Sequence, residues 1–164
     1  MSGGGSPRER ASIPAEFVDL LEGRALAHLA TIRPDGTPHA TPVWIDYQDG
    51  LLVVNAREGR VKTANMLARP AVAISIVDPG NPYRYLSIEG IVESIDEDRG
   101  LAHMDKLSRR YLGVDRYPWG VEGERRVLFR IRPTRVSADA GRVAIPTADA
   151  PAHEAVVGHQ QPKP

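Results

Sequence analysis

The sequence predicts a mainly β protein: a small antiparallel barrel, closed or partly open, with helices at its ends. Apolar and polar residues alternate with a period of two in most central segments, as in half-buried strands. Two junctions between these segments, Asp35-Gly36 and Asp49-Gly50, are turns of the kind that join strands into hairpins. The segments follow one another as hairpins rather than alternating with helices, so we do not expect a parallel sheet.

The first predicted element is a helix over residues 12–23. Ser12 is a suitable N-cap, Pro14 is tolerated in the first turn, and Gly23 can end the helix. Its apolar positions recur at helical spacing; they are Ile13, Phe17, Leu20 and Leu21.

Six strands are predicted after this helix. They cover residues 25–32, 37–46, 51–56, 71–77, 83–95 and 126–136. Pro38 and Pro42 lie inside the second strand, and proline cannot donate a hydrogen bond to a neighbouring strand. We therefore expect this strand at an edge of the sheet. The last strand is expected to turn Val127, Phe129 and Ile131 inward and Arg126, Arg130 and Arg132 outward.

Two further helices are predicted between the strands. The first covers residues 60–68 and is stopped by Pro70; its apolar stripe is Val61, Ala64, Leu67 and Ala68. The second covers residues 96–112, with Asp96 as its cap and Gly113 at its end. Its expected inner face is Leu101, Met104, Leu107 and Tyr111.

One folded domain is predicted over residues 12–137. Residues 1–11 are rich in glycine, serine and charge, and residues 138–164 are rich in alanine and proline. Such segments bury too little apolar surface to offset their ordering entropy, so we expect two disordered tails.

Composition excludes several function classes. The 164 residues contain 21 lysines and arginines against 21 aspartates and glutamates, so the whole molecule carries no net field that attracts nucleic acid. Cysteine is absent, which removes disulfides, thiolate metal sites and cysteine nucleophiles. The five histidines show no metal-binding spacing. No apolar run is long enough to span a bilayer or resembles a secretion signal, so we expect a cytoplasmic protein without metal, membrane or nucleic-acid partners.

A basic cluster over residues 55–65 is the main candidate site. It joins the end of a strand, a turn containing Gly59 and the start of a helix, where free backbone N–H groups and the helix dipole favour anions. Arg57, Arg60 and Lys62 add cations, which oppose the dipole unless an anion is present. The cluster therefore indicates a phosphate site; the alternative is a set of solvated charges.

Two weaker features accompany this cluster. The proline-interrupted strand over residues 38–44 leaves backbone groups unpaired, which can face a planar heteroaromatic ligand or simply form an edge strand. Tyr111 is expected in the core. The other members of the aromatic set are Tyr83, Tyr85, Tyr117 and Trp119. Of these, Tyr83 and Trp119 lie in or beside proline-containing loops and can line a ligand pocket or an interface. We interpret Arg109-Arg110 and Arg125-Arg126 as solvated charges.

Three motifs follow one another in the chain: the Leu-Ala-Thr-Ile-Arg-Pro-Asp-Gly-Thr-Pro-His-Ala-Thr-Pro-Val-Trp segment (29–44), the Arg60-x-Lys62-x-x-Asn65 motif and the Arg-Pro-Ala-Val-Ala-Ile-Ser segment (69–75). This order of motifs resembles the FMN-binding split-barrel superfamily. More narrowly, the chain is similar to the pyridoxamine 5'-phosphate oxidase-like proteins that use the deazaflavin coenzyme F420. The later segments 85–93 and 130–136 also match that group, and the resemblance covers residues 13–137.

The resemblance implies a six-stranded split β-barrel that forms a homodimer with cofactor sites at the interface. The cofactor phosphate would be held by Arg60 and Lys62 with Asn55, Arg57 and Thr63. The ring would lie along His39, Thr41, Pro42, Val43 and Trp44. Residues of the partner subunit would close the pocket, and the candidates are Tyr83, Tyr85 and Trp119.

The function implied is an F420-dependent oxidoreductase that transfers a hydride between the reduced cofactor and a small organic substrate with an activated double bond. The cofactor carries this chemistry, so we expect no protein nucleophile, and no proton donor is assigned. The full arginine pattern of true pyridoxamine phosphate oxidases is not evident, so vitamin B6 oxidation is not expected. The alternatives are an FMN-dependent oxidoreductase and a non-catalytic flavin or haem protein.

Overall fold

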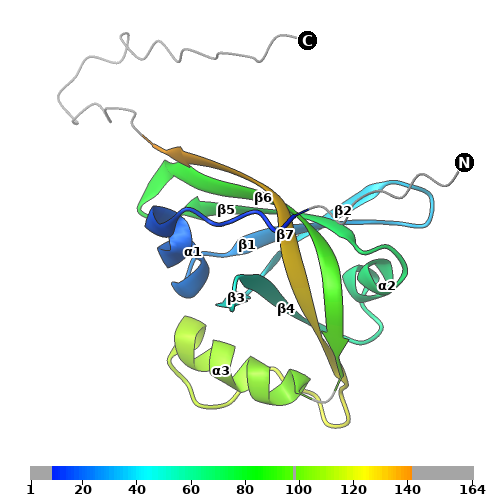
Figure 1. The fold of residues 1–164 in the computed structure, drawn as a ribbon. Coiled ribbons are helices and arrows are strands. Elements are labelled where there is room, and N and C mark those ends of the chain that lie inside the picture. The colour runs from blue at the N-terminus through cyan, green and yellow to red at the C-terminus, as the bar shows by residue number, and fades with distance from the viewer. Residues whose placement is uncertain (1–8, 98, 142–164) are drawn as a thin grey trace, which may run out of the picture.

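A single seven-stranded antiparallel sheet dominates the computed structural model, which describes residues 9–97 and 99–141 (Figure 1). Its strands are β1 (Ala27–Ile32), β2 (Pro38–Val43), β3 (Ile45–Gln48), β4 (Leu51–Arg57), β5 (Ala71–Asp78), β6 (Asn81–Asp96) and β7 (Arg126–Ala140). The order across the sheet is β2-β1-β5-β6-β7-β4-β3. The predicted mainly β, antiparallel class is confirmed.

The seventh strand arises because the predicted segment 37–46 breaks at Trp44. Ile45 and Asp46 are consecutive yet both buried, so the alternation of faces does not continue through this point. β2 pairs with β1 at one edge of the sheet, and β3 pairs with β4 at the other. The edge position predicted from Pro38 and Pro42 is confirmed.

Two irregularities interrupt the pairing of the long strands β6 and β7. The register shifts at Glu89/Gly90 and again between Val92 and Ser94. Such bulges increase the local twist of a sheet. At the first of them the backbone approaches β7 closely: a Cβ on Gly90 would lie 2.6 Å from Ile131 Cγ2. Glycine is therefore required there for close packing rather than for an unusual φ.

The helical elements are a 3-10 turn η1 (Ala15–Phe17), α1 (Val18–Glu22), α2 (Val61–Ala68) and α3 (Gly100–Leu112). The predicted N-cap Ser12 is wrong, because Pro14 precedes the first turn and makes no side-chain cap bond. α3 begins at Gly100 rather than at Asp96, whose Oδ1 instead accepts a bond from the Arg99 N–H at 3.1 Å. The predicted end of α3 at Gly113 is confirmed, with φ +75°.

α2 buries a different face from the one predicted. The apolar stripe is exposed, with Val61 at 42% and Leu67 at 51%, and Thr63, Asn65 and Met66 are buried instead. The buried polar groups have partners, since Asn65 Nδ2 donates to Thr31 Oγ1 at 3.0 Å and the Thr63 hydroxyl donates to a backbone carbonyl. The helix is therefore oriented by hydrogen bonds on its polar side.

Two buried layers lie on opposite faces of β4 and β7. The main core contains Ile45, Leu52, Val54, Phe129 and Ile131. The intervening residues on the other face are covered by α3, which Figure 1 shows beneath β3 and β4. The buried apolar residues of this second layer are Val53, Leu128, Met104 and Leu107. Leu101, predicted on the inner face of α3, is 56% exposed.

Secondary structure and backbone hydrogen bonds extend slightly beyond the predicted domain limits. β7 continues to Ala140, and the Ala11 N–H donates to the Pro133 carbonyl at 2.9 Å. The rest of the two predicted tails, residues 1–8 and 142–164, lies outside the described residues. No helix in the described part of the chain is long and apolar enough to cross a membrane.

Candidate functional site

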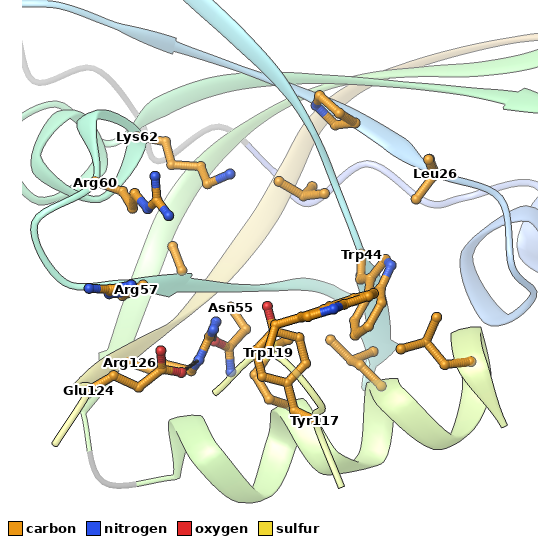
Figure 2. A pocket seen from close by; sticks show the side chains of 16 residues that line it. Leu26, Trp44, Asn55, Arg57, Arg60, Lys62, Tyr117, Trp119, Glu124 and Arg126 are labelled. Carbon is orange, nitrogen blue, oxygen red and sulfur yellow. Dashed lines mark hydrogen bonds and ion pairs between the residues drawn. The ribbon is translucent and has the colours of Figure 1, made fainter. Parts of the chain in front are cut away.

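A cavity of about 530 Å³ opens between β4, the start of α2 and α3. Figure 2 shows its cationic side chains on one side and its aromatic side chains on the other. The cationic end contains Arg57, Arg60 and Lys62. The apolar and aromatic part contains Leu26, Pro42, Val43, Trp44, Met104, Leu107, Leu112, Tyr117 and Trp119. Asn55, Glu124 and Arg126 add polar groups between the two ends.

The cationic end is formed by the turn that joins β4 to α2. Gly59 makes this turn at φ +81°, which glycine adopts without strain, and Arg60 then stands at the N-cap of α2 with no side-chain cap bond. The first turn of α2 contains no acidic residue. Glu58, the nearest carboxylate in the sequence, faces Arg125 at 3.7 Å instead. Among the described residues, Arg57, Arg60 and Lys62 therefore have no carboxylate partner, whereas the fourth cavity cation, Arg126, pairs with Glu124.

Lys62 reaches into the cavity from the first turn of α2. Its Nζ donates to Thr41 Oγ1 at 3.2 Å. Burial lowers the pKa of Lys62, and the positive charges of Arg60 and Arg126 lower it further. A bound anion would reverse these effects, because it stabilises the charged ammonium. The electrostatics of this end favour a negatively charged ligand.

Stacked aromatic rings form the opposite wall. Trp44 stacks on Tyr111 with centroids 5.0 Å apart and an interplanar angle of 7°, while Tyr117 meets Trp44 edge-on at 5.8 Å. Trp119 lies 6.2 Å from Trp44 and is 60% exposed. Both tryptophans of the chain thus line the cavity.

Tyr111 supports this wall from behind rather than joining the main core, where we expected it. Its hydroxyl accepts a bond from the Ile45 N–H at 3.2 Å and donates to the Ala25 carbonyl at 3.1 Å. Burial raises the pKa of Tyr111. These bonds position the Tyr111 ring against Trp44.

Two arginines that we interpreted as solvated are in fact built into the site or its support. Arg126, predicted to face outward, has only 8% of its side chain exposed, and its Nε pairs with Glu124. Arg110 donates to Asp46 Oδ1 at 2.5 Å and to the Ile45 carbonyl at 2.9 Å. Both side chains lie where α3 and the segment after it cover the face of β3, β4 and β7 that strand alternation assigns to solvent.

The cavity contains eight of the thirteen residues predicted for the site. They are Pro42, Val43, Trp44, Asn55, Arg57, Arg60, Lys62 and Trp119. Thr63 is buried, and its hydroxyl donates to the Arg57 carbonyl at 2.6 Å. Thr41 lies behind Lys62, and His39 Nδ1 is buried without a hydrogen-bond partner among the described residues. Tyr83 and Tyr85 are exposed on β6 and do not line this cavity. Ligand binding by any of the thirteen stays a prediction.

Sequence reasoning missed Arg126, Glu124 and the role of α3. The pairing of Arg126 with Glu124 follows an i, i+2 spacing at the start of a strand, a signal too common to single out a site. Among the described residues, no three histidine, aspartate or glutamate side chains gather in a way that would hold a metal ion.

Comparisons with known proteins agree with this fold. The sequence model of the family described as pyridoxamine 5'-phosphate oxidase matches residues 13–139. A solved structure of an F420 reductase shares 41% identity, covers 76% of this chain and 98% of its own, and superposes with a TM-score of 0.69. No curated protein matches the chain in sequence.

More distant structures share the fold alone. A conserved hypothetical protein from Mycobacterium tuberculosis is 22% identical, with a TM-score of 0.61 over 89% of this chain and 99% of its own. The haem storage protein of Vibrio cholerae is 16% identical, with a TM-score of 0.56 over 78% of this chain and 95% of its own.

Proposed function

Because the chain belongs to the pyridoxamine 5'-phosphate oxidase family, we propose that it is an oxidoreductase that binds the deazaflavin cofactor F420 in this cavity. FMN is the alternative cofactor. The reaction proposed is hydride transfer between the cofactor and a small organic substrate with an activated double bond. The 41% identical structure named as an F420 reductase supports the choice of deazaflavin over FMN.

The observation that carries the proposal is the pairing of unneutralised cations with an aromatic wall inside one cavity. F420 and FMN each combine a phosphate with a planar ring system. Arg57, Arg60 and Lys62 suit the phosphate, because they are positively charged and arginine offers paired N–H donors. The first turn of α2 adds backbone N–H groups that have no partner within the helix. The stacked rings beside Trp44 suit the planar part.

The chain's own contribution would be binding, orientation and exclusion of water. When bound, the cofactor supplies the hydride chemistry. Arg60 and Lys62 would hold its phosphate, with Arg57 nearby. Pro42, Val43 and Trp44 would flank its ring, and the aromatic wall would keep water from the reacting face.

Cofactor titration tests this proposal, because both tryptophans line the cavity and their fluorescence reports on its occupation. We expect F420 to quench this fluorescence, with Arg60→Ala and Lys62→Ala each weakening binding about 10- to 150-fold, the value of one charge-assisted contact. Arg69→Ala is the matched control, since it removes the same charge at the other end of α2. Unchanged affinity in the Arg60 and Lys62 variants would contradict the phosphate site.

The visible spectrum of the purified protein separates the candidate ligands. Bound F420, FMN and haem absorb at different wavelengths, so a co-purified ligand identifies itself. A haem spectrum without flavin or deazaflavin binding would overturn the proposal in favour of a haem protein.

We also propose that the protein acts as a homodimer in which the partner subunit helps to close the cavity. Exposed apolar side chains support an interface, among them Val61 and Leu67 on α2 and Tyr83 and Tyr85 on β6. Sedimentation should give twice the 17.9 kDa chain mass. A monomer that still binds cofactor tightly would contradict a shared site.

A further inference from the structure

Arg126 is a buried cation with bonding capacity left over. It lines the cavity, although only 8% of its side chain is exposed. Its Nε pairs with Glu124, its Nη1 donates to Asn55 Oδ1 at 3.3 Å, and its guanidinium carbon lies 4.7 Å from the centre of the Tyr117 ring. Among the described residues these contacts use two of its five N–H groups. The remaining donors lie at a cavity surface.

A chain of buried hydrogen bonds supports Arg126 from below. Asn55 Nδ2 donates to the Gly100 carbonyl at 2.6 Å and lies 3.4 Å from His103 Nδ1. The other ring nitrogen, His103 Nε2, lies 3.2 Å from Asp46 Oδ2. The side chains of His103 and Asp46 are 6% and 1% exposed, so this series of hydrogen bonds is shielded from water. It joins β3, α3, β4 and β7.

The partners fix the orientation of the Asn55 amide. Its carbonyl oxygen must face the Arg126 donor, and its NH2 must face the Gly100 carbonyl. A flipped amide would place donor against donor at Arg126 and acceptor against acceptor at Gly100. The second hydrogen of the NH2 is then directed at His103 Nδ1. That nitrogen must therefore accept, which leaves the proton on Nε2 to donate to Asp46.

We propose that His103 is a positioning residue that acts through Asn55 on Arg126, and that Arg126 donates a hydrogen bond to an oxygen atom of the bound cofactor. The proposal rests on the proposed function for the identity of the ligand. The oxygen belongs either to a carbonyl of the ring or to the phosphate. Arg126 suits both, because guanidinium donors bind carbonyl and acidic oxygens alike.

The tautomer of His103 is the first test and needs no cofactor. In 15N NMR spectra, the ring nitrogen without a proton should be Nδ1, and the one that carries the proton should be Nε2. The polar partners of the ring are Asp46 and Asn55. Asp46 also bonds the cations Lys106 and Arg110, and Asn55 also bonds Arg126. A proton on Nδ1 would overturn the proposal that His103 positions Arg126 through Asn55, whether or not Nε2 is also protonated.

Two substitutions at His103 separate positioning from packing. His103→Asn keeps an acceptor near the place of Nδ1 and loses the contact to Asp46, whereas His103→Gln keeps a donor near the place of Nε2 and loses the acceptor. For thermal stability we expect the Gln variant to equal or exceed the Asn variant. For cofactor affinity we expect the opposite order, with Gln weakened at least about fivefold more than Asn. The same order in both measurements would overturn the positioning role. His28→Gln on the exposed face of β1 is the control.

Arg126→Gln tests the ligand contact and identifies the oxygen. Whichever of F420 and FMN the wild type binds is titrated together with the phosphate-free form of the same ring. An affinity loss of about tenfold or more for both forms assigns the ring carbonyl, and a loss for the phosphorylated form alone assigns the phosphate. No loss for either form overturns the contact. A wild type that binds neither cofactor overturns the proposed function and the ligand role together, while the imidazole spectrum still tests the positioning chain separately.

Discussion

Asp46 accepts hydrogen bonds from several side chains beneath the cavity, and its substitution by asparagine gives a quantitative prediction. Its side chain is 1% exposed. Oδ1 accepts from Arg110 at 2.5 Å, and Oδ2 accepts from Lys106 at 2.6 Å and from Gln48 at 2.7 Å. Asparagine has the same shape but one oxygen, so either orientation of its amide places an NH2 group against a donor.

The expected cost at pH 7 is about 3 kcal/mol, the lower end of the range for removing one partner of a buried ion pair. The lower end applies because Lys106 is half exposed and Arg110 is one-fifth exposed, so both regain some hydration. For a chain of this size the melting temperature should fall by about 6–12 °C. Asp49→Asn is the control: Asp49 lies in an exposed turn at φ +53°, which asparagine tolerates.

The pH dependence of this difference provides a second check. Hydrogen bonds from His103, Lys106 and Arg110 hold the pKa of Asp46 far below its ordinary value, despite its burial. A depressed folded-state pKa gives stability that is present above the unfolded value near 4 and is lost as the pH falls through the folded one. The free energy of unfolding, measured in urea, should therefore differ less between wild type and Asp46→Asn below about pH 4 than at pH 7. A gap below about 1 kcal/mol at pH 7, or one that widens in acid, would refute the reasoning.

Two more predictions use other charged groups. Arg84 bonds Asp19 at 2.6 Å and Asp78 at 2.7 Å and lowers the pKa of both, so Arg84→Met should lower the melting temperature by roughly 2–4 °C at pH 7. Because both pKa values are depressed, this difference should fade in thermal scans as the pH falls below about 4, and its persistence in acid would contradict the ion pairs. The lowered pKa of Lys62 predicts that the affinity for a phosphate-bearing cofactor declines as the pH rises towards 10, since the anion prefers the charged amine. Lys62→Arg should bind with less pH dependence in the same fluorescence titration, because arginine stays charged, and equal pH profiles would argue against contact between Lys62 and the anion.

The sheet and the cationic turn could be predicted from sequence because their signals are local. Period-two alternation and two Asp-Gly turns predicted the strands, and Pro38 and Pro42 predicted the edge. The cations of the 55–65 cluster also lie where the turn after β4 was expected to place them, at the start of α2. Each of these depends on residues near one another in the chain, where backbone geometry leaves few alternatives.

The rest could not be predicted because it depends on contacts between distant segments. Alternation places Asp46, Asn55 and Arg126 on the outward face of their strands, and only the packing of α3 on that face buries them. The exposed stripe of α2 has a related cause. Asn65 bonds Thr31, 34 positions earlier, and Met66 beside it packs in the main core, so the buried side of the helix is not its apolar stripe.

The two halves of the cavity are held by different kinds of structure, and this bears on how its specificity can change. The cationic end and Arg126 belong to β4, β7 and the start of α2. Buried hydrogen bonds fix the side chains of Asn55 and Arg126. Trp119 instead belongs to the segment between α3 and β7 and is largely exposed. Substitutions in that segment reshape the aromatic end without disturbing the strands, because loops tolerate change that a paired strand does not. If the proposed function holds, the end of the cavity that binds the cofactor should therefore tolerate few substitutions. Substrate preference can change instead through substitutions around Trp119.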